Sequence, residues 1–181
     1  MNDRFNKLLD VLKSSINAIE KQYYDFQVAG NDEPIKRERV FCAELYHQMR
    51  LRFESIEYGI NIEPDKKSHP IIEKFCGPID PDLVVHRVGC MGPEDNLAVI
   101  EVKSSTGDLT SGIEKDLKTI NCMTSIQNGY YGGIIIVFGP LTERKKGNLI
   151  ERIRNLKSKD IARLTLVLRL EADAIPDVIE I

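Results

Sequence analysis

The sequence predicts an α/β domain in which a mixed β-sheet is flanked by helices, with its elements in the order α-α-β-β-β-α-β-α-β. Two observations indicate this class. The start of the chain has apolar residues at helical spacing, whereas the rest alternates short β-branched runs with segments of helical period, which is typical of a sheet covered on both faces. At 181 residues, the chain suits one domain at residues 31–181 with an N-terminal helical extension at residues 1–30.

Two helices are predicted before the sheet. The first is expected over residues 3–27, because apolar residues recur there at helical spacing; they are Phe5, Leu8, Leu9, Leu12, Ile16 and Ile19. A segment with glycine and proline at residues 30–34 ends this helix. The second helix is expected from about Pro34 to Glu54, since proline suits the first turn of a helix.

The remaining elements follow from the change of period and from the turn residues. Strands are expected at residues 70–75, 82–88, 97–103, 133–138 and 163–170, and helices at residues 110–127 and 142–157. Residues 89–96 contain two glycines and a proline, which predicts a hairpin loop between the second and third strands.

Membrane and secretory functions are not favoured by the sequence. The longest apolar run, residues 134–138, has the length of a strand, and the N-terminus lacks the pattern of a signal peptide. The cysteines, Cys42, Cys76, Cys90 and Cys122, are far apart and form no CxxC pair. We therefore expect reduced thiols in a cytoplasmic protein, without membrane partners and without a structural zinc site.

The charge is unevenly distributed along the chain. The net charge of −3 argues weakly against a nucleic-acid partner. Residues 141–170, however, contain nine Lys or Arg against three acids, an excess that can hold a phosphate backbone. A solvated helix face explains the same segment equally well.

The predicted hairpin brings two acids and a lysine together. If the strands pair about the loop, Val88 faces Leu97 and Asp82 faces Lys103. Because residues two apart share a face, Asp82, Glu101 and Lys103 then project to the same side of the sheet. A register shift of two residues leaves them on that side.

This group has the side chains needed for metal-assisted hydrolysis. Two carboxylates brought out of water are costly unless a cation compensates them. Mg²⁺ commonly takes one or two protein carboxylates together with waters and substrate phosphate. A lysine beside such an ion can orient or deprotonate a water, which suits attack on a phosphodiester.

A further acid is expected from the second helix. Glu44 is flanked at helical spacing by Val40, Phe41 and Leu51, so we expect it on the apolar face, pointing toward the same ion directly or through water. Glu38 lies near that face as well. It is in the first turn, however, where the helix dipole explains an acid without any function.

Pro81-Asp82 followed by Glu101-Val102-Lys103 resembles the PD-(D/E)XK nuclease superfamily, which has the restriction-endonuclease-like fold. The resemblance covers roughly residues 35–170 and includes the order of elements. It implies a Mg²⁺ ion, replaceable by Mn²⁺, held by Asp82, Glu101 and the Val102 carbonyl. Lys103 would serve the attacking water.

The resemblance also implies further roles. Glu44 matches the upstream helical acid of the family, and Lys118 matches a position on the helix after the motif that often binds phosphate. The expected substrate is DNA, with RNA as an alternative, and a second copy of the chain is a further partner to consider. Expected contacts to nucleic acid are made by basic residues of the segment after the fourth strand together with Lys118: Arg144, Lys145, Lys146 and Arg152.

Other interpretations of the same residues stay open. Asp82 after a proline is common in turns, and Glu101 with Lys103 also suits a solvated strand end. The alternative function is a non-catalytic module that keeps the fold and binds nucleic acid or protein. Neither GxxxxGK nor GxGxxG is present, so ATP and dinucleotide enzymes are not supported.

Overall fold

The computed structural model describes residues 1–53, 57–62, 70–90, 92–126 and 129–181. A six-stranded mixed sheet with the order β1-β2-β3-β4-β5-β6 forms its centre. Its strands are β1 (Gly59–Ile62), β2 (Leu83–His86), β3 (Asn96–Ser104), β4 (Gly132–Phe138), β5 (Arg163–Arg169) and β6 (Asp177–Glu180). The helices are α1 (Asn2–Asn17), α2 (Lys21–Tyr24), α3 (Glu38–Arg52), α4 (Pro70–Cys76), α5 (Leu109–Ser125) and α6 (Glu143–Leu156).

The middle of the sheet is parallel and its edges are antiparallel. β3, β4 and β5 run parallel, linked through α5 and α6, whereas β1, β2 and β6 pair antiparallel with their neighbours. All residues of β4 are buried and β3 is buried along most of its length. The sequences of such strands are continuous apolar runs, because both faces of the strands are covered.

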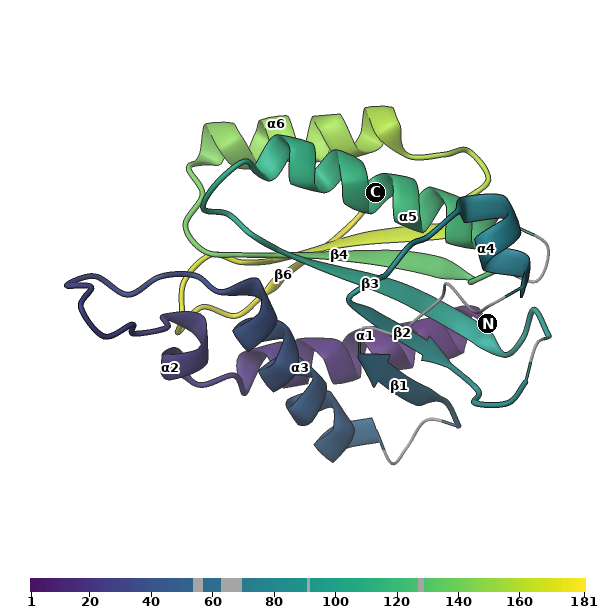
Figure 1. Ribbon diagram of the computed structural model, residues 1–181, viewed down its shortest axis with the longest axis horizontal. Coiled ribbons are helices and arrows are strands. Elements are labelled where there is room, and N and C mark those ends of the chain that lie inside the picture. Colours follow the sequence, from purple (N-terminus) through teal and green to yellow (C-terminus); the bar gives the residue numbers. More distant parts are fainter. Residues whose placement is uncertain (54–56, 63–69, 91, 127–128) are drawn as a thin grey trace.

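Helices cover the sheet on two sides (Figure 1). α1 and α3 lie on one face, and α5 and α6 lie on the other, with α4 beside the end of α5. Each face has its own apolar core. The core beneath α1 and α3 includes Phe41, Leu83 and Val102, and the core beneath α5 and α6 includes Val84, Val99 and Leu117.

The N-terminal helix is part of the first of these cores. Phe5, Leu8 and Ile16 are completely buried in it, as expected of an amphipathic helix. Arg169 of β5 donates hydrogen bonds to the carbonyls of Ile16 and Ile19, at and just after the end of α1. The helix predicted over residues 3–27 is interrupted, because α1 ends at Asn17 and the short α2 follows.

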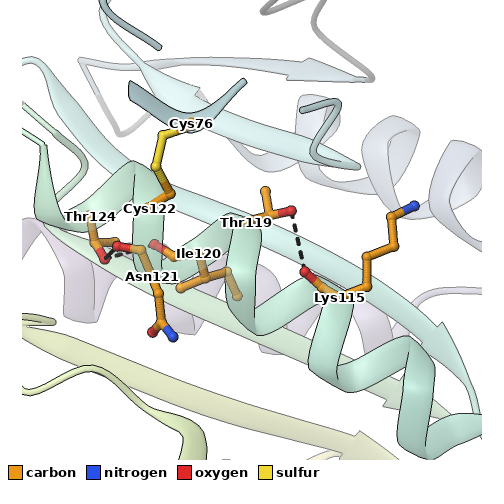
Figure 2. The surroundings of a disulfide bond; sticks show 7 residues. All are labelled: Cys76, Lys115, Thr119, Ile120, Asn121, Cys122 and Thr124. Carbon is orange, nitrogen blue, oxygen red and sulfur yellow. Dashed lines mark hydrogen bonds between the residues drawn. A yellow bond between two sulfur atoms is a disulfide. The ribbon is translucent and has the colours of Figure 1, made fainter. Parts of the chain in front are cut away.

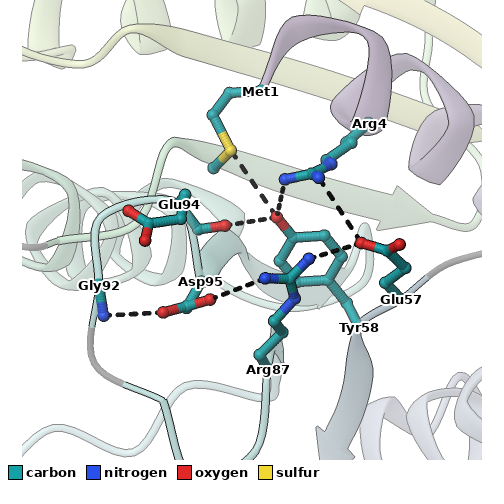
Figure 3. Close-up of polar contacts among 8 residues, drawn as sticks. All are labelled: Met1, Arg4, Glu57, Tyr58, Arg87, Gly92, Glu94 and Asp95. Carbon is teal, nitrogen blue, oxygen red and sulfur yellow. Dashed lines mark hydrogen bonds and ion pairs between the residues drawn. The ribbon is translucent and has the colours of Figure 1, made fainter.

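A polar network ties α1 to the hairpin of β2 and β3 (Figure 3). The Tyr58 hydroxyl accepts a hydrogen bond from Arg4 at 3.1 Å and donates one to the Glu94 carbonyl at 2.5 Å. Glu57 pairs with both Arg4 and Arg87. The network lies where β3 begins, at the opposite end of that strand from Lys103.

The prediction of a strand at residues 70–75 is wrong. This segment forms α4, and the first strand of the sheet is instead Gly59–Ile62. Its β-branched residues favour a strand, but proline at the first helical position favours the helix that forms. β6 was not predicted either. The predicted helix ends at Glu54 and Gln127 lie outside the described residues.

The expectation that all cysteines are reduced is also wrong. A disulfide joins Cys76 of α4 to Cys122 of α5, with 5.7 Å between the two Cα atoms (Figure 2). Cys42 is buried and free, and Cys90 is exposed and free. The paired cysteines are 46 residues apart, a separation that has no recognisable spacing pattern.

The helices of the described segments include none with the length and apolar character needed to cross a membrane.

Candidate active site

Asp82, Glu101 and Lys103 come together on the face of the sheet that α5 covers. Val84 pairs with Val99, and both belong to the core beneath α5. Asp82 lies two residues before Val84 and Glu101 two residues after Val99, so both acids share this face. The predicted register was wrong by two residues, since it is Glu101, not Lys103, that lies opposite Asp82.

The two carboxyl groups are held where water is largely excluded. Glu101 is 5% exposed. Burial raises the pKa of Glu101 well above its usual value, and the negative charges of Asp82 and Asp116 raise it further. Burial also raises the pKa of Asp82, although the Val102 N–H opposes this by donating a 2.6 Å hydrogen bond to its Oδ2. The pair therefore favours a proton or another cation between its carboxyl groups.

Lys103 is surrounded by carboxylates. Its Nζ atom lies 3.5 Å from Glu38 Oε2 and 3.5 Å from Asp116 Oδ2. Burial alone would lower the pKa of Lys103, but the nearby carboxylates, led by Asp116 and Glu38, raise it above its usual value. Lys103 is thus held as an ammonium ion beside the acidic pair.

The helical acid at this site is Glu38, and Glu44 is not brought to it. Glu38 Oε1 accepts a 2.9 Å hydrogen bond from the Ser104 N–H, and its other oxygen faces Lys103. Glu44 is only half-buried and accepts a 2.6 Å hydrogen bond from Gln48, one turn further along α3. Its neighbour Leu51, used to place it on an apolar face, is 62% exposed.

α5 contributes Asp116, which the sequence analysis did not identify, and not Lys118. Asp116 is 3% exposed, whereas Lys118 is exposed to solvent. Burial raises the pKa of Asp116 to about 6, and Lys103 opposes the shift. Asp116 lies in the apolar stripe of Ile113 and Leu117. An acid within an apolar helical stripe was the pattern from which Glu44 was predicted, and it could also have identified Asp116.

The basic residues of α6 lie away from this group. Lys146 pairs with Asp177 of β6 at 2.8 Å. β6 is the edge strand of the sheet that lies furthest from β1 and β2. Arg152 pairs with Glu114 of α5. Arg144 and Lys145 are exposed and form no ion pair with other residues that the structure describes.

A groove of about 580 Å³ separates the N-terminal part of α5 from α6. Ser105 and Gly107, just after β3, line one end, and Lys145 and Arg152 line the side formed by α6. The acidic pair is not among its lining residues. The groove is therefore separate from the acidic pair.

The carboxylates of Asp82 and Glu101 suit a hard divalent cation that takes few of its ligands from the protein. Within the described segments, no group of three or more His, Cys, Asp or Glu residues forms a metal site. Mg²⁺, however, commonly uses only one or two carboxylates and fills its other positions with water. Asp82 and Glu101 meet this smaller requirement. Val102 could contribute only its backbone carbonyl, because its side chain is a hydrocarbon without a donor atom and is buried in the other core.

Comparison with protein-family models, with curated proteins and with solved structures found no match to this chain.

Proposed function

We propose that this protein is a divalent-metal-dependent nuclease of the restriction-endonuclease-like fold that hydrolyses DNA phosphodiester bonds. The observation that supports it best is the buried pair of Asp82 and Glu101 beside the ammonium group of Lys103. Buried acidic pairs with raised pKa values are costly to fold and occur preferentially at functional sites.

Asp82 and Glu101 would hold Mg²⁺ or Mn²⁺ through their carboxylates, together with the Val102 carbonyl. Both carboxyl groups have raised pKa values because they are buried, so a cation would relieve an unfavourable accumulation of charge. When bound, the ion would lower the pKa of a coordinated water and offset the negative charge of the phosphate.

Lys103 would act as a fixed positive charge. Its raised pKa keeps the side chain protonated at neutral pH, so it donates hydrogen bonds to the attacking water or to a phosphate oxygen. Glu38, which bonds to the Ser104 N–H, keeps the end of β3 and the lysine in place.

Arg144 and Lys145 on α6 are the best-placed predicted contacts to a DNA backbone, because Lys146 and Arg152 are already paired with acids of the chain. The alternative function is a non-catalytic module of the same fold that binds nucleic acid or protein. The two functions differ in one respect that can be measured, which is metal-dependent cleavage.

The test is to incubate the purified protein with single-stranded, duplex and branched DNA, and with single-stranded RNA, in Mg²⁺, Mn²⁺, Ca²⁺ or EDTA. We expect cleavage of a DNA form in Mg²⁺ and Mn²⁺, with none in EDTA and little in Ca²⁺. Lys103→Ala serves as the inactive control. Absence of cleavage of every DNA and RNA substrate in Mg²⁺ and Mn²⁺ would refute the nuclease proposal and favour the binding module. Cleavage of RNA alone would contradict DNA as the substrate.

A further inference from the structure

The Lys103 ammonium group lies between two carboxylates that come from different helices. Glu38 of α3 and Asp116 of α5 each approach its Nζ atom to 3.5 Å. The side chain of Glu38 is 42% exposed, whereas that of Asp116 is 5% exposed. The two acids therefore differ in how firmly the surrounding protein fixes them.

The ion pair with Lys103 is the interaction that favours a buried, charged Asp116. Its Oδ2 atom makes no hydrogen bond with the described residues, and the Lys103 ammonium group 3.5 Å away offsets its charge. A buried carboxylate without hydrogen bonds costs stability, and a polar or apolar residue would fit the helix at lower cost. The presence of an acid at this position therefore points to a role for its charge.

α5 also guides the aliphatic part of Lys103. A Cβ atom added at Gly112 would lie 3.0 Å from Lys103 Cδ, so the lysine stem passes close to this glycine. Asp116 follows one turn further along the same helix. The absence of a side chain at Gly112 thus lets the stem lie against α5, and Asp116 meets its charged end.

We propose that Asp116 is a positioning residue that, together with the space left at Gly112, holds the Lys103 ammonium group beside the Asp82–Glu101 pair. This inference rests on the proposed function, since orientation of the lysine matters for catalysis only if the site cleaves phosphodiesters. Asp116 acts through Lys103 and is not a metal ligand.

The experiment is a double-mutant cycle on cleavage rate in Mg²⁺. Asp116→Asn should lower the rate at saturating DNA by about 10- to 100-fold, because small misplacements of a catalytic group have effects of this order. In a Lys103→Ala background the same change should have almost no further effect. Affinity for Mn²⁺, measured by calorimetry, and affinity for DNA in Ca²⁺ should stay within about twofold of the parent values.

Two further variants complete the design. Glu114→Gln is the matched control, because Glu114 is an acid of the same helix that pairs with Arg152 and not with Lys103. Gly112→Ala keeps every charge and has a good helix former in place of glycine, but crowds the lysine stem. It should lower the cleavage rate without lowering the thermal midpoint, and it provides the test if Asp116→Asn fails to fold.

The inference is overturned by full activity of Asp116→Asn, by an additive loss in the Lys103→Ala background, or by a large loss of Mn²⁺ affinity. The last result would make Asp116 a ligand. Each of these results leaves the proposed function intact if the parent protein cleaves DNA. An inactive parent, in contrast, removes the proposed function and this inference with it.

Discussion

Asp82, the residue just before β2, lies opposite Glu101 of the neighbouring antiparallel strand β3, because Leu83 pairs with Ile100 and the next residues outward are these two acids. The charge of Asp82 raises the pKa of Glu101 in addition to the larger effect of burial, whereas the pKa of Asp82 is raised by burial and lowered by a hydrogen bond with Glu101. Two acids in this arrangement oppose folding when both are ionised. The predictions on stability and on metal binding follow from this cost of two ionised acids in the folded state.

Glu101→Gln should stabilise the metal-free protein at neutral pH. The pKa of Glu101 is raised on folding, so its contribution to stability is fully present below its unfolded value, near pH 4.5, and is lost as the pH rises through the folded value. The variant avoids that loss. Its free energy of unfolding at pH 8 in EDTA should exceed that of the parent by more than about 1 kcal/mol, since one pKa unit is worth about 1.4 kcal/mol.

Urea unfolding curves at several pH values test this prediction. The difference between the variant and the parent should shrink toward pH 4, where Glu101 is protonated in both the folded and the unfolded parent. Glu44→Gln is the matched control, because Glu44 is half-buried but outside the cluster, and it should change stability by less than about 0.5 kcal/mol. A Glu101→Gln variant less stable than the parent at pH 8 would show that the ionised pair is not a cost.

Divalent cations should reverse this order of stability. Mn²⁺ or Mg²⁺ bound to the folded state raises the free energy of unfolding by mass action, by about 2.7 kcal/mol at 100 times the dissociation constant. The thermal midpoint of the parent should therefore rise with Mn²⁺ concentration, while that of Asp82→Asn or Glu101→Gln should not. Equal rises in the parent and in both variants would place the ion elsewhere.

The Cys76–Cys122 disulfide should be a substantial support of the fold. Closing a loop with a sequence separation of 46 residues is expected to stabilise the protein by about 4 kcal/mol through the unfolded state. Cys76→Ser should lose most of this, and a dithiol reductant should destabilise the parent but not the variant. Cys90→Ser, at an exposed free thiol, is the control. Equal urea midpoints for the parent and Cys76→Ser would contradict the pairing.

DNA binding should depend on the unpaired cations of α6. Replacing both Arg144 and Lys145 by Ala should reduce the slope of log affinity against log salt by about 2, because each phosphate contact contributes about 0.9. Replacing Lys146 and Arg152, which pair with Asp177 and Glu114, should reduce it less. Affinities measured in Ca²⁺ between 50 and 200 mM salt decide the matter, and identical slopes for the two double variants would refute the distinction.

The central strands and the side on which the acids lie could be predicted because they depend on short-range patterns. The period of two along a strand places Asp82, Glu101 and Lys103 on the same face whether or not the register is shifted by two residues. The shift itself was missed because the strand pairing ends earlier than predicted, at His86 with Asn96 instead of Val88 with Leu97, and because an irregularity between Val85 and His86 then changes the register by one residue. No local sequence pattern predicts such a bulge.

The helical contributions to the site were predicted less well. Glu38 was set aside because the helix dipole explains an acid in the first turn, yet the same position brings it to the end of β3. Asp116 could have been found, since an acid within an apolar helical stripe was the argument applied to Glu44. Residues 70–75 show the limit of strand propensity, because a proline at the first position and packing beside α5 favour a helix there.

Metal-dependent cleavage by a matched set of acid variants tests the nuclease proposal most directly. Glu101→Gln and Asp82→Asn each remove one expected ligand, whereas Glu44→Gln removes an acid that lies outside the cluster. The assay uses Mg²⁺ and whichever DNA form the parent cuts. The cleavage rates of Glu101→Gln and Asp82→Asn should be at least about 100-fold lower than that of the parent, because removal of a group that stabilises the transition state has an effect of this order. Glu44→Gln should cut at the rate of the parent. Cleavage by Glu101→Gln and Asp82→Asn at the rate of the parent, or no cleavage by the parent, would contradict the assignment of this cluster as a nuclease centre.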